Sequence, residues 1–436
     1  MSEMKAAPDW SGNGNNSNTP SGVPEVDDTI ETSIPEVSEP AVNPVGASMI
    51  SEEQKVATGQ SGRQTGNEKS YIYSRKPDFI CPFCMREIYT GDLLYFCKRC
   101  GKMYTEEEAK EQLSRVVKRQ YYCCNDNITS SRICPNCRIE KENGRIKNDL
   151  RMLPSEVYRI KNEFRVCMTG YSASGKTQYI TQLMDYIAKY SLPGIDSTYF
   201  LDNETQNIRE AIRHKFFEQR SIAGTASGYL EPLLFNIHKG KHSYVSVFYD
   251  IAGEDFRENR DTLATRCIWN SKNVLLVIDP TTLPDLDLEK NQKLKEFKAS
   301  QGKASTGEVT EPLNTYLNFV RGKHPNGEKF LKKVNLAIVF PKMDLFYEEE
   351  DFPESLKKES SHIAKGKFDV EEVTAVSQAM ERWLRSKGGN ALLSAIRGYS
   401  NIQIFGVSSG SLEEQKQPNR LLDPYLWLLY RNDIFK

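Results

Sequence analysis

The sequence predicts an α/β domain over residues 160–436, in which helices cover both faces of a mostly parallel β-sheet. Two observations predict it. Short, apolar, β-branched runs recur along this part of the chain, and stretches of helical length separate them. Parallel strands that are buried on both faces have this near-continuous apolar character. The apolar runs are Arg165–Thr169, Tyr244–Asp250, Asn273–Asp279, Val334–Phe340 and Asn401–Val407, and the helical stretches include Lys176–Lys189 and Met380–Arg397.

The composition limits the class of protein. The 436 residues carry a formal net charge of −1, so bulk positive charge does not support nucleic-acid binding, although a local patch stays open. The apolar runs are far shorter than the roughly 20 residues that span a bilayer, and the N-terminus lacks the pattern of a secretory signal. We therefore expect a cytoplasmic protein without a membrane span. Residues 1–70 hold 11 acidic and 4 basic residues and few aromatic ones, which predicts a disordered acidic tail.

Eight of the ten cysteines lie within residues 78–140, which predicts a small zinc-ribbon module ahead of the α/β domain. Without an export signal, reduced thiols that bind metal are favoured over disulfides. The module contains no histidine, so its thiolates fit one or two structural zinc ions. The candidate ligands are Cys81, Cys84, Cys97, Cys100, Cys123, Cys124, Cys134 and Cys137.

Two pairings of these cysteines are open. In a sequential pairing, the Cys81–Cys84 knuckle shares one ion with the Cys97–Cys100 knuckle. In an interleaved pairing, it shares the ion with the Cys134–Cys137 knuckle instead. Adjacent Cys123 and Cys124 form an unusual knuckle, so one of the two need not be a ligand.

Residues 170–177 read Gly-Tyr-Ser-Ala-Ser-Gly-Lys-Thr, which is the Walker A pattern of a phosphate-binding loop. Glycines at both ends let the loop wrap a phosphate, and its backbone N–H groups meet the positive end of the following helix. Lys176 can reach the β- and γ-phosphates, and the Thr177 hydroxyl can bind magnesium. The predicted nucleotide contacts are Gly170, Ser172, Ala173, Ser174, Gly175, Lys176, Thr177 and Gln178.

A second element agrees with this prediction. The apolar run Tyr244–Asp250 ends in an acid, and Gly253 follows three residues later. A carboxylate at a strand end beside the phosphate loop can hold magnesium, so Asp250 is the second predicted magnesium residue. Gly253 leaves its N–H free to meet the γ-phosphate.

The region from about 160 to 436 resembles the Ras-like P-loop GTPases of the TRAFAC class, and more narrowly the bacterial double-GTPase-type domains of conflict and defence systems. The residues that carry the resemblance are GYSASGKT at 170–177, YDIAGEDF at 249–256, LLVIDP at 275–280 and DPYLWLL at 423–429. The resemblance implies a Ras-like P-loop NTPase fold that binds GTP or GDP with magnesium. It implies that Thr225 closes over the magnesium as a mobile switch residue.

The same resemblance implies the base-binding residues. Ras-like GTPases carry Asn/Thr-Lys-x-Asp after the next strand, and this chain has Pro341-Lys342-Met343-Asp344 there. Lys342 and Asp344 match, whereas Pro341 departs and cannot supply a side-chain hydrogen bond. The Ser408-Ser409 pair stands where the family contacts the guanine oxygen.

These residues together predict a nucleotide-dependent switch with slow GTP hydrolysis. Lys176, Thr225, Gly253 and Glu254 are the predicted catalytic residues. Glu254 stands where the family often has glutamine, and a carboxylate beside the γ-phosphate adds repulsion, so we expect a protein partner or activator. A non-hydrolysing scaffold and an ATP-dependent, nucleic-acid-associated NTPase are the alternatives. The charged segment Phe346–Lys367 is predicted to be a solvated insertion.

Overall fold

The computed structural model describes residues 77–113, 120–137, 141–142, 145–146, 152–171, 173–203, 205–207, 209–211, 232–252, 263–301, 308–408 and 418–435. The predicted disordered tail, residues 1–70, lies outside them. Residues Lys76–Lys436 belong to one compact unit. The boundary predicted between the cysteine module and the α/β domain stays a prediction.

A seven-stranded sheet forms the centre of the described α/β region, in the order β11-β12-β13-β10-β14-β15-β16. Five neighbouring strands, from β13 through β16, run parallel. Strand β12 is antiparallel to β13, and β11 is antiparallel to β12. The prediction of a largely parallel sheet is therefore confirmed. The strands are β10 (Asn162–Gly170), β11 (Ser197–Phe200), β12 (Leu233–Lys239), β13 (His242–Ala252), β14 (Asn273–Val277), β15 (Asn335–Phe340) and β16 (Ile402–Gly406).

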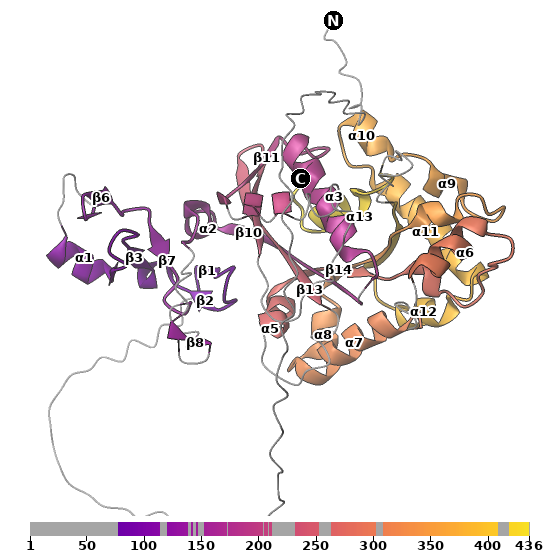
Figure 1. The fold of residues 1–436 in the computed structure, drawn as a ribbon, viewed down its shortest axis with the longest axis horizontal. Coiled ribbons are helices and arrows are strands. Elements are labelled where there is room, and N and C mark those ends of the chain that lie inside the picture. Colours follow the sequence, from indigo (N-terminus) through magenta and orange to yellow (C-terminus); the bar gives the residue numbers. More distant parts are fainter. Residues whose placement is uncertain are drawn as a thin grey trace, which may run out of the picture. The chain divides into compact units, whose positions relative to one another are not determined.

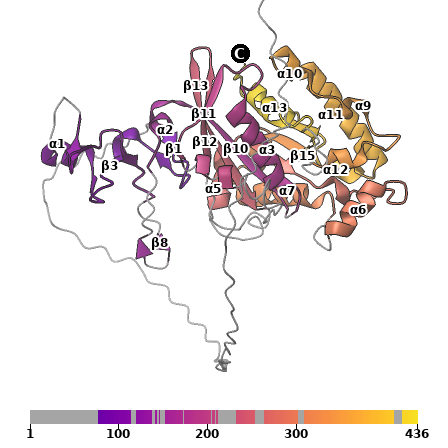
Figure 2. The same ribbon diagram turned by 45° about the horizontal axis from the view of Figure 1, so that its top comes forward.

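Helices cover both faces of this sheet (Figures 1 and 2). Helices α3 (Lys176–Lys189) and α13 (Asp423–Arg431) pack into one core. Helices α5 (Leu263–Asn270), α7 (Glu311–Lys323) and α12 (Asn390–Ala395) pack into the core on the other face. The remaining helices of this region are α2 (Ser155–Arg159), η3 (Pro280–Thr282), α6 (Gln292–Gln301), α8 (Gly327–Leu331), η4 (Met343–Phe346), α9 (Glu354–Lys357), α10 (Ser361–Lys365) and α11 (Val370–Ser386).

The two cores arise because successive side chains of a strand point to opposite faces. In β14, Val274 and Leu276 belong to one core, whereas Leu275 and Val277 belong to the other. Every residue of β14 is buried, which explains why its sequence reads as a continuous apolar run rather than as an alternating one.

The cysteine-rich region consists of short elements. Helix α1 begins at a capping box, in which Thr105 accepts from the Glu108 backbone and the Glu108 carboxylate accepts from the Thr105 backbone. The elements are β1 (Phe79–Ile80), β2 (Glu87–Ile88), η1 (Thr90–Asp92), β3 (Leu94–Phe96), β4 (Met103–Tyr104), α1 (Glu106–Gln112), β5 (Tyr122–Cys123), β6 (Asp126–Asn127), β7 (Arg132–Ile133), β8 (Lys141–Glu142) and β9 (Arg145–Ile146). The strands here are only two or three residues long, so bound metal is expected to add to the stability that the buried side chains provide.

Two sequence-based expectations are wrong. The stretch Met380–Arg397 is two helices rather than one, because Gly388 takes a φ of +81° after α11 and ends it. The segment Phe346–Lys367 is not a solvated insertion: Phe346, Phe352 and His362 are buried, and α9 and α10 lie within it. Because charged residues are frequent in this segment, its few buried positions do not stand out in the sequence.

Candidate functional site

The carboxyl ends of the parallel strands bring the predicted nucleotide residues to one edge of the sheet. Strand β10 pairs with β13 so that Gly170 lies beside Ala252, and β15 pairs with β16 so that Phe340 lies beside Gly406. Strand β10 also has β14 on its other side, so the chain reverses its direction of travel across the sheet there. Ligands of open α/β sheets bind outside the strand ends at such a reversal.

The loop from Gly170 to Gly175 has a backbone that only glycine permits at two points. Gly170 has a φ of +154°, and a Cβ there would lie 2.2 Å from the carbonyl oxygen of Val277. Gly175 has a φ of +98° and forms the N-cap of α3. The loop is therefore held against β14 at its start and opens directly into a helix at its end, as a phosphate cradle requires.

Lys176 is the first residue of α3 and is only 5% exposed. Its Nζ donates to the carbonyl oxygens of Gly170 at 2.6 Å and Tyr171 at 2.8 Å. The ammonium group therefore lies across the loop, where a lysine of this motif meets phosphate. Ser174 Oγ is buried and has no hydrogen-bond partner among the described residues.

Asp250 lies near the end of β13, where its register partner is Met168 of β10. It therefore stands two residues before the edge at which the phosphate loop begins. Thr177, in the first turn of α3, is partly buried. The other predicted residues around the γ-phosphate, Ser172, Thr225, Gly253 and Glu254, lie outside the described residues, so their roles stay predictions.

Lys342 joins the segment predicted to bind the base to the predicted phosphate loop. Its Nζ donates to the carbonyl oxygen of Ala173 at 2.9 Å and to Asp279 Oδ2 at 2.7 Å. Asp344 Oδ1 accepts a hydrogen bond from Ser408 Oγ at 2.8 Å, so two predicted base residues touch each other. The structure thus brings Lys342, Asp344 and Ser408 together, whereas Ser409 lies outside the described residues.

Pro341 packs against the phosphate loop. A Cβ built on Gly175 would lie 3.0 Å from Pro341 Cγ and 3.7 Å from Lys342 Cε. The ring therefore occupies the space beside the loop at the position where Asn or Thr was expected. The proline ring contacts the loop by van der Waals packing, whereas an Asn or Thr side chain could form hydrogen bonds there.

Two residues of the site were not assigned from the sequence. Asp279 follows β14, is 7% exposed, and forms the ion pair with Lys342. Phe297 lies on α6 with its ring centroid 4.9 Å from Lys342 Nζ. An acid at the end of a buried strand is the pattern that indicates Asp250, and the same pattern indicates Asp279. Phe297 gave no such signal, because its contact depends on how α6 packs beside η4.

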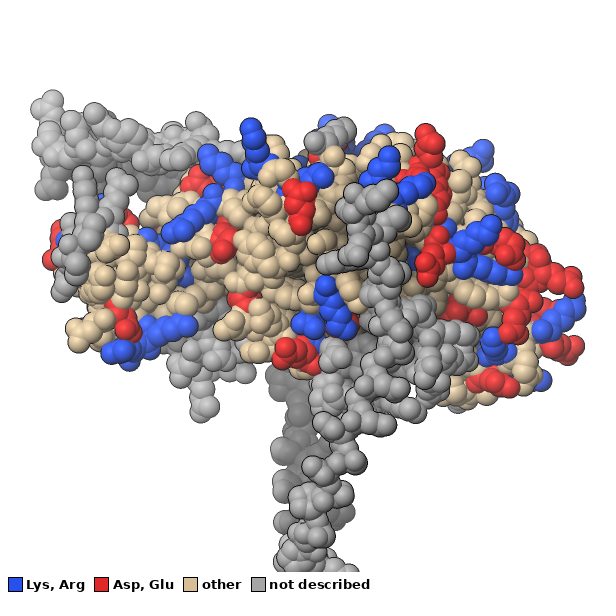
Figure 3. Space-filling model, turned by 90° about the horizontal axis from the view of Figure 1, so that it is seen from above, with Lys and Arg blue, Asp and Glu red and all other residues tan. Residues whose placement is uncertain are grey.

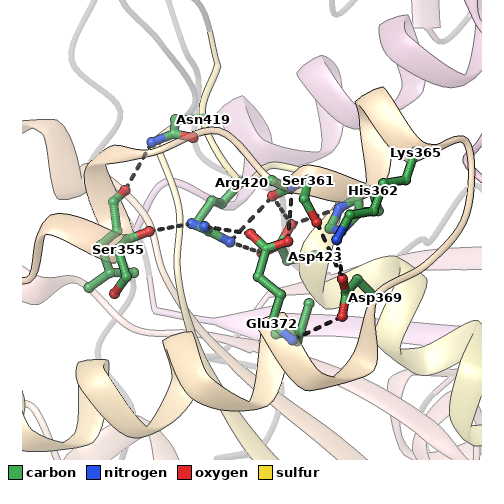
Figure 4. A network of polar contacts seen from close by, with 12 residues as sticks. Ser355, Ser361, His362, Lys365, Asp369, Glu372, Asn419, Arg420 and Asp423 are labelled. Carbon is green, nitrogen blue, oxygen red and sulfur yellow. Dashed lines mark hydrogen bonds and ion pairs between the residues drawn. The ribbon is translucent and has the colours of Figure 1, made fainter.

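A buried ionic network anchors the chain just after the base side (Figure 4). Arg420 donates to Asp423 and Glu372, each at 2.9 Å, and to the carbonyl oxygen of Ser355 at 3.0 Å. His362 Nε2 lies 3.0 Å from Asp423 Oδ1. The neighbouring Asn419 pairs with Ser408 through two backbone hydrogen bonds of 3.0 and 2.8 Å. The network therefore helps to fix Asn419, whose isolated β-bridge with Ser408 holds Ser408 beside Asp344.

The eight clustered cysteines form two groups of four. Cys81, Cys84, Cys134 and Cys137 make the first group, and Cys97, Cys100, Cys123 and Cys124 make the second. The interleaved pairing is therefore the one observed for the Cys81–Cys84 knuckle, and both adjacent cysteines belong to the second group. The ligand atoms within each group all lie within 4.8 Å of one another.

The sulfur spacing fits zinc. The Sγ atoms of Cys81 and Cys137 are 3.7 Å apart, as are those of Cys84 and Cys134. In the second group, Cys100 and Cys123 are 3.6 Å apart. Zinc–sulfur bonds of about 2.3 Å in a tetrahedron place sulfurs about 3.8 Å apart, whereas a disulfide would be far shorter.

The knuckle backbone and the thiol pKa values agree with metal binding. Met85 N donates to Cys81 O at 2.9 Å and Gly101 N to Cys97 O at 2.8 Å, so both knuckles close with the same turn. A hydrogen bond from the Lys102 backbone lowers the pKa of Cys100 to about 7, whereas contact with Cys100 raises the pKa of Cys124 to about 12. Four adjacent thiols cannot all ionise without a cation among them.

Comparison with known proteins leaves the family open. No family model and no curated protein matches the sequence. The structure of the Arl6 (BBS3) small GTPase from Trypanosoma brucei, with the bound analogue GppNp, aligns over 63% of this chain and 100% of its own, at 15% identity and a TM-score of 0.28. A TM-score this low carries no structural argument, so the site is argued from the contacts described above.

Two observations concern the apolar and charged character of the described residues. Within the described ranges, no helix has the length and apolar character needed to cross a bilayer. On the face that Figure 3 presents, Lys and Arg are interspersed with Asp and Glu among uncharged residues. That face therefore lacks the single-sign band that phosphate backbones favour.

Proposed function

We propose that this chain is a GTP-binding protein that acts as a nucleotide-dependent switch and hydrolyses GTP slowly with magnesium. The observation that carries the proposal is the contact between Lys342 Nζ and the carbonyl oxygen of Ala173, at 2.9 Å. One lysine thereby ties the segment expected to bind a base to the loop expected to bind phosphates. A nucleoside triphosphate has these two ends, and both recognition elements stand at the same sheet edge.

Each residue has a stated role in the proposal. Lys176 and the backbone N–H groups of the loop bind the β- and γ-phosphates. Thr177 and Asp250 hold magnesium, which when bound neutralises charge on the phosphates. The Asp344 carboxylate accepts the guanine N1–H and N2–H, and it retains free lone pairs for this after accepting from Ser408.

Slow hydrolysis follows from Glu254 rather than from the described geometry. A carboxylate near the γ-phosphate repels the negative charge on the phosphate oxygens and the negative charge that develops on the attacking water as it loses its proton. Turnover would then depend on a protein partner that supplies positive charge or reorients the water. We assign Thr225 and Gly253 to the γ-phosphate side and Ser172 and Ser409 to nucleotide contacts on the sequence pattern. A role in bacterial conflict or defence, which the resemblance implies, stays a prediction.

The two cysteine groups complete the proposal as structural zinc sites. All four positions of each group are thiols, so no position is left open for a catalytic water. We propose that they stabilise short elements that cannot hold a core alone.

The test is a nucleotide panel measured by calorimetry on the full chain, with GTP, GDP and ATP, with and without magnesium. We expect guanine nucleotides to bind more tightly than ATP and magnesium to increase the affinity for GTP. Lys176→Ala should abolish GTP binding, whereas Lys189→Ala, at the other end of α3, should not. Binding of ATP as tight as that of GTP would refute the guanine assignment.

Asp344→Asn tests the base contact separately. Guanine offers two donors to the carboxylate, whereas an amide side chain presents one acceptor and one donor. The variant should therefore lose GTP affinity and gain affinity for xanthosine triphosphate, which offers one donor and one acceptor at these positions. An unchanged preference for GTP would remove Asp344 from the site.

A non-hydrolysing scaffold is the second candidate, and the Pro341 ring against Gly175 favours it, because Pro341 packs against the loop and supplies no side-chain hydrogen bond of its own. Phosphate release by the wild-type chain that disappears in Lys176→Ala would exclude it. Equal release by both proteins would mean a contaminating phosphatase and would leave the scaffold standing.

A further inference from the structure

The first cysteine knuckle, Cys81–Met85, contacts the elements that flank the predicted γ-phosphate segment. Strand β13 carries Asp250 near its end, and α5 begins at Leu263. Side chains from both elements donate hydrogen bonds to backbone carbonyl oxygens of the knuckle. Its position and that of Asp250 are therefore linked through direct contacts.

Three hydrogen bonds make the link. Tyr249 Oη donates to Pro82 O at 3.0 Å, Arg266 Nη1 to Cys84 O at 3.1 Å, and Asn270 Nδ2 to Met85 O at 3.0 Å. The acceptors are three carbonyls within four consecutive residues, so all three depend on one local backbone shape.

The Tyr249 bond is buried, and the other two bonds are partly buried. Tyr249 is 1% exposed, and its hydroxyl donates to Pro82 O at 3.0 Å. Cys81, Cys84 and Met85 share one core with Ile251 and Cys267. Buried acceptors that lose a donor cost more than exposed ones, so the contacts resist separate movement.

The knuckle shape depends on its sulfurs meeting one ion. Met85 takes a φ of +58°, a conformation that a non-glycine residue adopts at a cost. In the knuckle this backbone places the Cys81 and Cys84 sulfurs beside those of Cys134 and Cys137. Without a cation that binds all four sulfurs, the turn loses this crosslink and can open, which would move the three carbonyls.

The second cysteine group offers an internal comparison. Cys100 and Cys124 are exposed, and Cys97 and Cys123 belong to a separate small core. Arg99 Nη1 donates to Cys124 O at 3.2 Å, so an arginine contacts a cysteine carbonyl here too. This arginine also pairs with Asp126 of the same cysteine-rich region, at 2.8 Å.

We propose that the metal held by Cys81, Cys84, Cys134 and Cys137 positions Asp250 for magnesium, with Tyr249, Arg266 and Asn270 as positioning residues. The proposal rests on the nucleotide site proposed above. It makes zinc occupancy of the first group and magnesium-dependent nucleotide binding thermodynamically coupled. Because coupling is reciprocal, each ligand must then strengthen the binding of the other by the same factor.

The first experiment uses the wild-type full chain. Zinc loss to a chromogenic chelator that ignores magnesium is followed with a non-hydrolysable GTP analogue, in the presence and absence of magnesium. We expect magnesium with the analogue to slow the release of one of the two ions about fivefold or more and to leave the other unchanged. Release rates of the two ions that magnesium with the analogue leaves unchanged would overturn the proposal.

The second experiment uses matched variants. Tyr249→Phe and Arg266→Ala should raise the magnesium concentration needed for half-maximal analogue binding about fivefold or more, with unchanged affinity in the absence of magnesium. Tyr425→Phe is the control for the loss of a buried hydroxyl. The Tyr425 hydroxyl lies 3.2 Å from that of Ser246, which belongs to β13 like Tyr249. Arg99→Ala removes the corresponding contact at the second group. Neither control should shift the magnesium requirement.

The outcomes separate this proposal from the one on which it rests. If the wild-type chain binds no analogue, the proposed function fails and the coupling fails with it. If the analogue binds but the test and control variants have the same magnesium requirement as the wild type, the nucleotide site stands and the positioning role is refuted. If Arg266→Ala is too unstable to measure, Arg266→Lys takes its place. Because lysine keeps the positive charge, this variant should retain part of the coupling and so show a smaller rise in the magnesium requirement.

Discussion

Replacing Gly170 by alanine tests the phosphate loop at its most constrained point. The new Cβ would lie 2.2 Å from Val277 O, well inside contact distance, and 3.1 Å from Ser174 Oγ. The carbonyl belongs to the backbone of β14 and cannot rotate away. The φ of +154° adds strain for any residue with a side chain. Strain of about 1–3 kcal/mol and overpacking of a similar size add to about 2–6 kcal/mol lost from the free energy of unfolding.

Gly398→Ala is the matched control for this prediction. Gly398 also has a positive φ, +95°, but a Cβ there meets nothing within 4 Å. It should show the strain alone, about 1–3 kcal/mol. Urea denaturation gives both free energies, and calorimetry gives GTP affinity, which should fall at least about tenfold only in Gly170→Ala because its loop must shift. If the two variants lost the same stability and both kept GTP affinity, the proposed steric contact between β14 and the loop at Gly170 would be wrong.

Three further predictions concern charge and metal. Arg420→Ala leaves Asp423 and Glu372 without their cation in a buried network, so the free energy of unfolding by urea should fall by about 3–5 kcal/mol; a loss below about 1 kcal/mol would contradict it. Lys342→Ala and Asp279→Ala should each weaken GTP binding about tenfold, and the double variant should be no weaker than either, since one ion pair is lost in all three; additive losses would separate the two roles. The purified chain should contain two zinc ions, and chelation should remove the ion of the exposed second group first, as followed by metal analysis; a single release rate would contradict this order.

The sheet could be predicted because burial on both faces leaves a direct mark on the sequence. The residues of β14 and β15 are all buried, and their apolar runs were recognised. The predicted phosphate loop could be identified because its glycines supply positive φ angles that the local backbone needs. Information of this kind lies within a few consecutive residues and needs no knowledge of the rest of the chain.

Contacts between distant segments could not be predicted in the same way. Spacing alone left the cysteine pairing open, because a knuckle places two thiolates together but does not select the second knuckle. The burial of the Phe346–Lys367 segment was missed since His362 is paired there with Asp423, some 60 positions along the chain. A polar residue that is paired at long range looks the same in the sequence as one that is solvated.

The proline at position 341 shows how a site can keep its geometry while its sequence departs from the expected motif. An Asn or Thr there would hold neighbouring segments by hydrogen bonds, which depend on direction. The proline ring instead lies against Gly175, with Cγ 3.0 Å from where a Cβ would be. Orientation of the base side then depends on other polar contacts, and the structure has them: Lys342 bonds to Ala173 and Asp279, and Ser408 bonds to Asp344. If Asp344 binds guanine as proposed, base selection needs no side-chain donor at position 341, because the Asp344 carboxylate already accepts a hydrogen bond from Ser408, two residues after β16.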